Sequence, residues 1–219
     1  VATFCNNIAN GIPIQIKDIS TKLSLVYVDD VVADFISVIQ QDSRGISRPL
    51  IEPEYNITLG ELAFQIRAFE NCRVNLISEQ VGTGLVRALY STYVSYLKPE
   101  QFSYLLPRHL DERGVFVEML KTKESGQFSY FTSHPGVTRG KHFHNSKSEK
   151  FLVIKGFARF CFRHIVTDEL YEIFTNGNEP QVVDTVPGWT HDITNVGSEE
   201  MIVMIWANEI FNPDKPDTI

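Results

Sequence analysis

Two histidines and a glutamate lie between two glycines at spacings that suit metal binding. The segment runs from Gly136 to Gly156 and contains His142, His144 and Glu149. Side chains two residues apart on a β-strand point to the same face, so a strand through both histidines would place their imidazoles side by side. Neutral imidazoles and a carboxylate bind Zn²⁺, Fe²⁺, Mn²⁺ or Ni²⁺. The spacing therefore predicts a divalent metal site.

A second segment supplies a further candidate ligand. Pro187 and Gly188 predict a turn ahead of His191, and Asn195 follows four residues later. Histidines exposed on a surface strand would explain one His-x-His pair, but not two segments with this composition. We expect a divalent metal, zinc in the first instance, held by four side chains: His142, His144, Glu149 and His191.

Both segments resemble cupin motifs. The first matches the pattern Gly-x5-His-x-His-x4-Glu-x6-Gly of the first cupin motif at every defined position. The second resembles the second motif, although its proline and glycine are adjacent where the family has an intervening residue. The resemblance implies a double-stranded β-helix, the jelly-roll barrel of that family.

The residue pattern of the C-terminal half favours the same fold. From Gly114 onward, short runs with a period of two are separated by polar turns, which is typical of strands in an all-β domain. Besides the two motif strands, such runs begin at Val115, Gln127, Ala158, Leu170, Gln181 and Met201. We expect residues 114–219 to form a jelly roll, so that the chain is mainly β.

The first 98 residues have a mixed pattern of helices and strands. Helices are expected over residues 3–10, 31–40, 58–70 and 85–97, and strands over residues 12–17 and 23–28. Thr58, followed by Glu61 three residues later, has the spacing of a capping box that opens a helix. Residues 1–98 resemble the C-terminal, substrate-side part of an extended short-chain dehydrogenase/reductase. Residues 99–113 are expected to link this α/β part to the barrel.

The residues that such a reductase needs for hydride transfer are absent from this sequence. No Gly-x-x-Gly-x-x-Gly fingerprint follows an expected strand, and no Tyr-x-x-x-Lys pair occurs in a suitable context. In reductases of this type the glycines hold the dinucleotide pyrophosphate. We therefore expect the α/β part to be an incomplete domain, and NADPH to bind only to a full-length protein.

Composition and charge narrow the class of protein. A net charge of −7 argues against a non-specific binder of nucleic acid or of anionic membranes. The apolar runs are too short for a membrane span, and the N-terminus lacks the basic region of a signal peptide. The cysteines are odd in number and widely spaced, which suits reduced thiols. We expect a cytoplasmic protein.

Over nearly its whole length the chain also resembles the CapF family of capsular polysaccharide synthesis enzymes. The segments that carry this resemblance are residues 131–144, 149–156 and 192–197. In that family an N-terminal domain reduces a 4-keto sugar nucleotide with NADPH, and a C-terminal cupin epimerises a carbon beside the ketone. The resemblance implies an isomerase, expected as a homodimer, that epimerises a UDP-4-keto-6-deoxy-N-acetylhexosamine at C3 on the way to UDP-N-acetyl-L-fucosamine.

Epimerisation beside a carbonyl needs a base, an acid and a group that stabilises the enolate. If Phe128, Tyr130, Thr132 and His134 share the face that points to the metal, Tyr130 and His134 are the candidate acid and base, although either could serve only packing. Substrate contacts are expected from Arg139, Lys141 and Arg163. Trp189, Lys121 and Asp192 are weaker candidates.

Basic residues outnumber the single acid Glu149 between Arg139 and Arg163, which would suit a phosphorylated ligand. A solvated strand face with alternating lysines explains the same run equally well. Two other function classes also remain open. A cupin of this kind could bind or sense a small ligand without turnover, or it could be a metal-dependent dioxygenase or isomerase acting on another small molecule.

Overall fold

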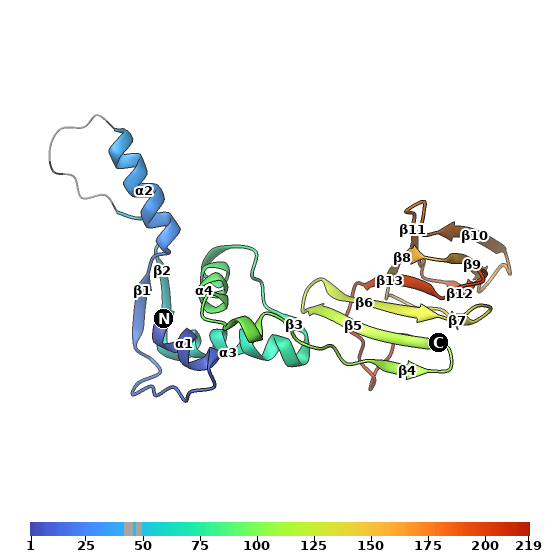
Figure 1. Cartoon of the computed structure of the whole chain (residues 1–219). Helices are drawn as coiled ribbons and strands as arrows, with labels where there is room; N and C mark the ends of the chain where they lie inside the picture. Colours follow the sequence, from blue (N-terminus) through green and yellow to red (C-terminus); the bar gives the residue numbers. More distant parts are fainter. Residues whose placement is uncertain (42–45, 47–49) are drawn as a thin grey trace. The chain divides into compact units, whose positions relative to one another are not determined.

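A computed structural model describes residues 1–41, 46 and 50–219 of the chain. It contains two compact units, which we call the α/β unit and the barrel unit. The α/β unit consists of Val1–Asn75 and Glu79–Ser103, and the barrel unit of Leu76–Ser78 and Tyr104–Ile219. Figure 1 labels their helices and strands. Among the described residues, no helix combines the length and apolar character that crossing a membrane requires.

Three helices enclose the core of the α/β unit. Its elements are α1 (Ala2–Ala9), β1 (Lys22–Leu25), α2 (Val28–Gln40), β2 (Tyr55–Thr58), α3 (Leu59–Asn75), α4 (Gly84–Val94) and the 3₁₀ helix η1 (Pro99–Gln101). Cys5 of α1, Leu62 and Ile66 of α3 and Leu89 of α4 are buried in one apolar cluster. Strands β1 and β2 pair antiparallel beside it.

Local sequence signals set the ends of these helices. The capping box at α3 is confirmed: the Thr58 N–H donates to the Glu61 carboxylate at 2.9 Å, and the Glu61 N–H donates to Thr58 Oγ1 at 3.2 Å. Helix α2 begins at Val28 and not at residue 31, so Asp29 and Asp30 lie in its first turn, where carboxylates favour the helix N-terminus. The strand expected over residues 12–17 is wrong, since Pro13 there cannot donate to a ladder.

The barrel unit is a two-sheet jelly roll, which confirms the expected fold class. Its strands are β3 (Ile77–Ser78), β4 (His109–Asp111), β5 (Gly114–Thr122), β6 (Gly126–Ser133), β7 (Thr138–His142), β8 (Glu149–Lys155), β9 (Phe157–His164), β10 (Leu170–Asn176), β11 (Val182–Asp184), β12 (Trp189–Asn195) and β13 (Met201–Ala207). One sheet has the order β10-β9-β12-β7. The other has the order β11-β8-β13-β6-β5-β3, with β4 paired to β5.

Apolar side chains from both sheets form one core between them. Phe151 of β8 and Val203 of β13 come from the larger sheet, and Phe160 of β9 and Ile193 of β12 from the smaller one. The ring centroids of Phe151 and Phe160 lie 5.6 Å apart in an edge-on arrangement. This contact between layers is what a strand period of two predicts when one face of each sheet is buried.

The segment 99–113, expected as a linker, contains two structured elements. Helix η1 lies within the α/β unit, whereas β4 pairs antiparallel with the start of β5 and so belongs to the barrel unit. Strand β4 has only three residues, all of them exposed. It therefore lacks the alternation of buried and exposed residues that reveals a strand in a sequence.

Asn195 at the end of β12 joins three parts of the barrel through the hydrogen bonds of its side chain. Its Nδ2 donates to the carbonyl oxygens of Ser133 and Glu199, each at 2.8 Å, and its Oδ1 accepts from the Gly197 N–H at 3.0 Å. The side chain is fully buried. It therefore fixes the turn between β12 and β13 to the end of β6.

Replacing Asn195 by Ala should lower the free energy of unfolding by about 1–3 kcal/mol, because buried carbonyls lose their donors. The matched control is Asn178→Ala, a change at an exposed position that should alter stability by no more than about 0.5 kcal/mol. Urea denaturation followed by circular dichroism measures both values. Equal stability of the two variants would contradict the assigned role of Asn195.

Candidate metal centre and its cavity

The four expected ligands converge within the barrel unit. One imidazole nitrogen or carboxylate oxygen from each of four residues lies within 4.8 Å of the others, and these residues are His142, His144, Glu149 and His191. His142 is half-buried and the other three are buried. The structure thus brings together the side chains that the two motifs singled out.

A β-bulge turns His142 toward His191. In the pairing of β7 with β12, His191 lies opposite His142 and Asp192 lies opposite Gly140, so Lys141 is the extra residue. A Cβ at Gly140 would lie 2.8 Å from the His191 carbonyl oxygen, and Gly140 has a φ of +96°. Only glycine fits this close approach. Lys141, an expected substrate contact, is exposed and does not line the cavity described below.

The spacing predicted a strand through both histidines, but His144 lies just beyond the end of β7. Its ring nevertheless packs beside that of His142, with centroids 4.8 Å apart. Its Nδ1 donates to the main-chain carbonyl of Asp217, since a carbonyl oxygen can only accept. This bond leaves the Nε2 of a neutral imidazole as an acceptor that points at Glu149.

The contacts around Glu149 fit a bound cation. Its Oε2 lies 3.3 Å from His144 Nε2 and 3.5 Å from His191 Nε2. Two acceptors that face one another repel unless a proton or a metal ion lies between them. His191 Nδ1 is also buried without a hydrogen-bond partner among the described residues. Three imidazoles and one carboxylate suit zinc and the other transition metals considered above.

Lys147 contacts the other oxygen of the same carboxylate. Its Nζ lies 3.0 Å from Glu149 Oε1, and only 11% of its side chain is exposed. Burial raises the pKa of Glu149, but without a metal a proton shared with the facing nitrogens of His144 and His191, together with the charge of Lys147, lowers it more, so the net pKa lies well below its ordinary value. Glu149 is therefore ionised, as a metal ligand must be.

Burial lowers the pKa of His142 to about 4, and the neighbouring His191 and His144 add to this shift. The attraction of Glu149 opposes it only in part. His142 is thus a neutral imidazole at neutral pH. This is the protonation state in which histidine binds metals.

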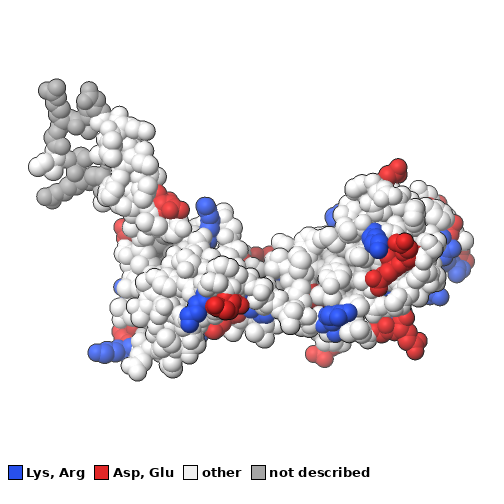
Figure 2. Space-filling model, in the orientation of Figure 1, with Lys and Arg blue, Asp and Glu red and all other residues white. Residues whose placement is uncertain are grey.

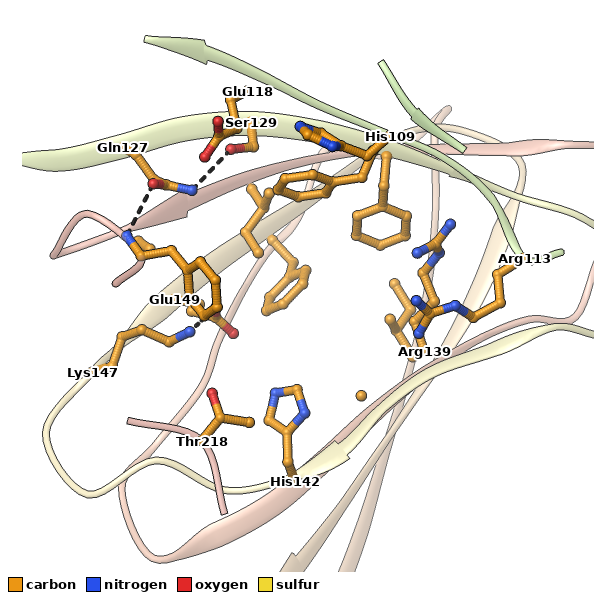
Figure 3. Close-up of a pocket in the computed structure, with 18 of the residues that line it drawn as sticks. His109, Arg113, Glu118, Gln127, Ser129, Arg139, His142, Lys147, Glu149 and Thr218 are labelled. Carbon is orange, nitrogen blue, oxygen red and sulfur yellow. Dashed lines mark hydrogen bonds and ion pairs between the residues drawn. The ribbon is translucent and has the colours of Figure 1, made fainter. Parts of the chain in front are cut away.

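The ligand group opens onto a cavity of about 520 Å³ in the barrel unit. Apolar walls come from Phe116, Phe131, Phe151 and Ile205, and Glu118, Gln127 and Ser129 add polar groups on one side. Figure 3 shows His142 and the Glu149–Lys147 pair pointing into this space from different walls.

A group of charged residues lies at another side of the cavity, on β4, on the turn between β4 and β5, and on β7. Asp111 is bonded to the Arg113 guanidinium and lies 3.6 Å from Arg139. The hydrogen bond from Arg113 is the main reason that the pKa of Asp111 falls to about 2. Arg139 is 12% exposed, lies 5.1 Å from the centroid of the Phe131 ring, and its Nε has no partner among the described residues. Figure 3 shows Arg113 and Arg139 side by side.

Strand β6 has the opposite parity to the one expected. Ser129 and Phe131 line the cavity, whereas Tyr130 does not, and His134 lies exposed beyond the end of the strand. The assumed common face of Phe128, Tyr130, Thr132 and His134 toward the metal is therefore wrong. The reason is that the polar residues which β6 buries, Gln127 and Ser129, carry no sequence mark that separates them from solvent-facing ones.

Two further expected substrate contacts also lie outside the cavity lining. The side chain of Arg163 is 59% exposed and pairs with Asp168 at 2.8 Å. Trp189 packs against the core cluster and His164. Lys121 pairs with Glu118 at 2.9 Å, and neither it nor Asp192 lines the cavity.

Most of the basic run forms surface ion pairs. Lys150 pairs with Asp184, and Arg159 lies 3.4 Å from Glu172. On the face shown in Figure 2, acidic and basic side chains are interspersed. Of the expected substrate contacts only Arg139 lines the cavity, and residue spacing gave no hint of Glu118, Lys147, Asp111 or Arg113.

Comparison with known proteins identifies the family. Residues 109–219 match the family named polysaccharide biosynthesis C-terminal domain. The chain belongs to this family. The resemblance to CapF is confirmed as well: the crystal structure of CapF from Staphylococcus aureus matches with a TM-score of 0.92 at 39% identity, over 99% of this chain and 64% of the CapF chain. CapF with the inhibitor 3-isopropenyl-tropolone matches with a TM-score of 0.93 at 39% identity, over 99% of this chain and 63% of that chain.

Two relatives are similar in sequence to this family member. UDP-2-acetamido-2,6-beta-L-arabino-hexul-4-ose reductase from Pseudomonas aeruginosa is 58% identical over 218 residues, covering 100% of this chain and 59% of the relative. Spore coat polysaccharide biosynthesis protein SpsL from Bacillus subtilis is 25% identical over 122 residues, which are 51% of this chain and 81% of SpsL. The chain thus spans less than two thirds of the reductase and of CapF.

Replacing His191 by Ala or Glu149 by Gln should remove most of the bound metal, because each change deletes one of four converging ligands. The control is His134→Ala, which removes an exposed histidine outside the group and should leave the metal content unchanged. Elemental analysis of tag-free protein purified without chelator measures the stoichiometry. Full metal content in both ligand variants would contradict the assignment.

The metal-free protein should lose stability as the pH falls from 7 to 5. Below its ordinary pKa of 6.5, His142 takes up a proton in the unfolded chain, whereas in the folded chain it stays neutral down to about pH 4. One such proton changes the free energy of unfolding by at most about 1.4 kcal/mol per pH unit, and partial exposure reduces this. Urea denaturation at several pH values, compared with His142→Gln, measures the slope. Equal slopes for the two proteins would contradict the lowered pKa.

Proposed function

We propose that this chain is the epimerising part of a CapF-type enzyme. The observation that carries the proposal is a group of three imidazoles and one carboxylate that opens onto a cavity with arginines at another side. The imidazoles and the carboxylate would hold a metal beside a reacting carbonyl, and the arginines would bind a phosphate. The two groups together suit a substrate that has both. The proposed substrate is therefore a sugar nucleotide.

The relative from Pseudomonas aeruginosa supports the choice of sugar. Its name specifies a UDP-linked 2-acetamido hexul-4-ose, which is a sugar with its ketone at C4. The hydrogen at C3, beside this ketone, is acidic enough for a base to remove. We assign to this chain the epimerisation of a UDP-4-keto-6-deoxy-N-acetylhexosamine at C3, on the way to UDP-N-acetyl-L-fucosamine for capsule.

The arginines would orient this substrate. Arg139 is positioned by its bond to the Thr132 carbonyl at 3.1 Å and by the Phe131 ring, and it keeps an unused Nε–H. Guanidinium groups bind phosphate oxygens with paired hydrogen bonds. Arg139, together with Arg113, is therefore the proposed diphosphate contact, in place of the exposed Arg163.

The proton transfer would use side chains that line the cavity. Glu118 is the proposed base, since it lines the cavity and its carboxylate is positioned by an ion pair with Lys121 at 2.9 Å. It would take the proton from C3 while the electron pair of the C–H bond moves toward the ketone oxygen, giving an enolate. Lys147, on another wall, would return a proton to the opposite face of C3. Solvent would then reset both groups.

A divalent metal, zinc in our proposal, would supply Lewis acidity to the ketone or would only hold the ligand strands together. The phenylalanine walls would exclude water and so strengthen the charged contacts inside the cavity. We further propose that the full-length protein is a cytoplasmic homodimer that also reduces the keto sugar with NADPH, using residues that this chain lacks. The α/β unit alone would not carry out that step.

Incubation with the UDP-4-keto sugar in heavy water should add one dalton to the sugar per turnover, without NADPH. Glu118→Gln should slow this exchange by about 10²–10⁴-fold, which is the usual cost of losing a general base. The matched controls are His134→Ala and Tyr130→Phe, which lie outside the cavity lining and should exchange at the wild-type rate.

Mass spectrometry of the sugar reports the result. A wild-type protein that binds the sugar but adds no deuterium would favour a sensor, and oxygen consumption with bound iron would favour a dioxygenase. Either outcome would overturn the proposed function. Wild-type exchange by Glu118→Gln would instead reassign the base.

A further inference from the structure

The segment Asp217–Ile219 lies along the loop that connects the ligands His144 and Glu149. Phe143 and Ile219 exchange two main-chain hydrogen bonds, with N···O distances of 3.0 Å and 3.1 Å. Phe143 is the residue between the two histidines of the first motif. Thr218 lines the cavity, and Figure 3 shows it beside His142. The segment is thus part of the wall of the site.

Asp217 makes most of the contacts in this segment. Its carboxylate accepts the N–H groups of three successive residues, at 3.0 Å from Asn145 and 2.8 Å from both Ser146 and Lys147. The side chains of Asn145 and Ser146 donate to it as well, at 3.0 Å and 3.2 Å. Its main-chain carbonyl accepts the Nδ1–H of His144. One residue therefore holds both the loop and a ligand ring.

These contacts replace a strand ladder that the loop does not have. Residues 143–148 lie between β7 and β8 and form no strand. Main-chain N–H groups without a partner would leave the loop free to adopt other conformations, and each would move His144 or Lys147. The carboxylate of Asp217 binds three N–H groups at once, as an anion does in a main-chain nest.

We infer that Asp217 is a positioning residue for the metal centre, which fixes the loop carrying Lys147 and, through its carbonyl, the orientation and tautomer of His144. This inference rests on the proposed function only in that it takes the four-ligand group to bind a metal. Outer partners of metal ligands fix ring orientation and raise metal affinity in the same way. Asp217 is not one of the four converging residues and does not line the cavity.

Asp217→Ala should weaken zinc binding by about 10–100-fold, which is the usual effect of losing an outer partner of a ligand. Asp217→Asn should have a smaller effect, since its amide oxygen can still accept hydrogen bonds from some of these main-chain N–H groups. The matched control is Asp214→Ala, three residues before Asp217. The printed hydrogen bond of Asp214 is donated by its main-chain N–H to Asn212 Oδ1, so it does not need the carboxylate. Titration of the full chain with zinc in competition with a chromophoric chelator measures the three affinities.

Two readouts separate positioning from a general loss of structure. Amide hydrogen exchange at residues 145–147 should become faster in Asp217→Ala while exchange in β9 and β12 stays the same. The ¹⁵N NMR signals of His144 should shift toward a mixture of tautomers in the metal-free variant. Neither readout depends on activity.

Zinc affinity within about twofold of the wild type in both Asp217 variants, with unchanged amide exchange at residues 145–147, would overturn this inference. It would leave the proposed epimerase intact. The opposite outcome is a wild-type protein that binds zinc but transfers no deuterium to the sugar, while Asp217→Ala weakens zinc binding. That outcome would remove the epimerase and keep the role of Asp217. The two failures are therefore distinguishable.

Discussion

The candidate site depends first on the close pairing of β7 with β12. His142 and His191 lie opposite each other in the same register, on strands that are far apart in sequence. Because Gly140 has no Cβ, the bulge can bring the chain close to the His191 carbonyl. Any other residue there would push the strands apart and with them two of the four ligands. The backbone conformation at one glycine thus decides whether the ligands can meet.

The charges around Glu149 are balanced within the cavity. One carboxylate oxygen faces His144 and His191, and the other contacts Lys147. A buried carboxylate is costly unless cations or donors surround it, so the removal of either set would leave an uncompensated charge. Lys147 has the same requirement, since most of its side chain is buried. The charge of Lys147 therefore stabilises the ionised form of Glu149.

Sequence alone predicted the jelly roll and the ligand group, but it did not predict most of the cavity. Fixed spacings identify His142, His144, Glu149 and His191, and alternation of apolar residues identifies every long strand of the barrel unit. Parity along β6 could not be determined, because Gln127 and Ser129 are polar residues that the fold buries. Strand β4 gave no signal although it pairs with β5 directly after it, because its three residues are all exposed. Asp217 gave no signal because the N–H groups that it accepts lie about 70 residues away in sequence. Pairing over such distances has no local pattern.

The arginines at the cavity differ in how readily a phosphate could bind them. The pair of Asp111 and Arg113 is about half exposed on both sides, and exposed ion pairs contribute little to stability. A phosphate could therefore take the place of Asp111 at small cost. Arg139 is largely desolvated, and burial lowers its pKa while the charge of Asp111 opposes this. An incoming anion would compensate this partly buried charge, so Arg139 should contribute more of the binding free energy than Arg113. The exposed β4 would then supply an exchangeable counter-ion, and the buried arginine of β7 the fixed contact.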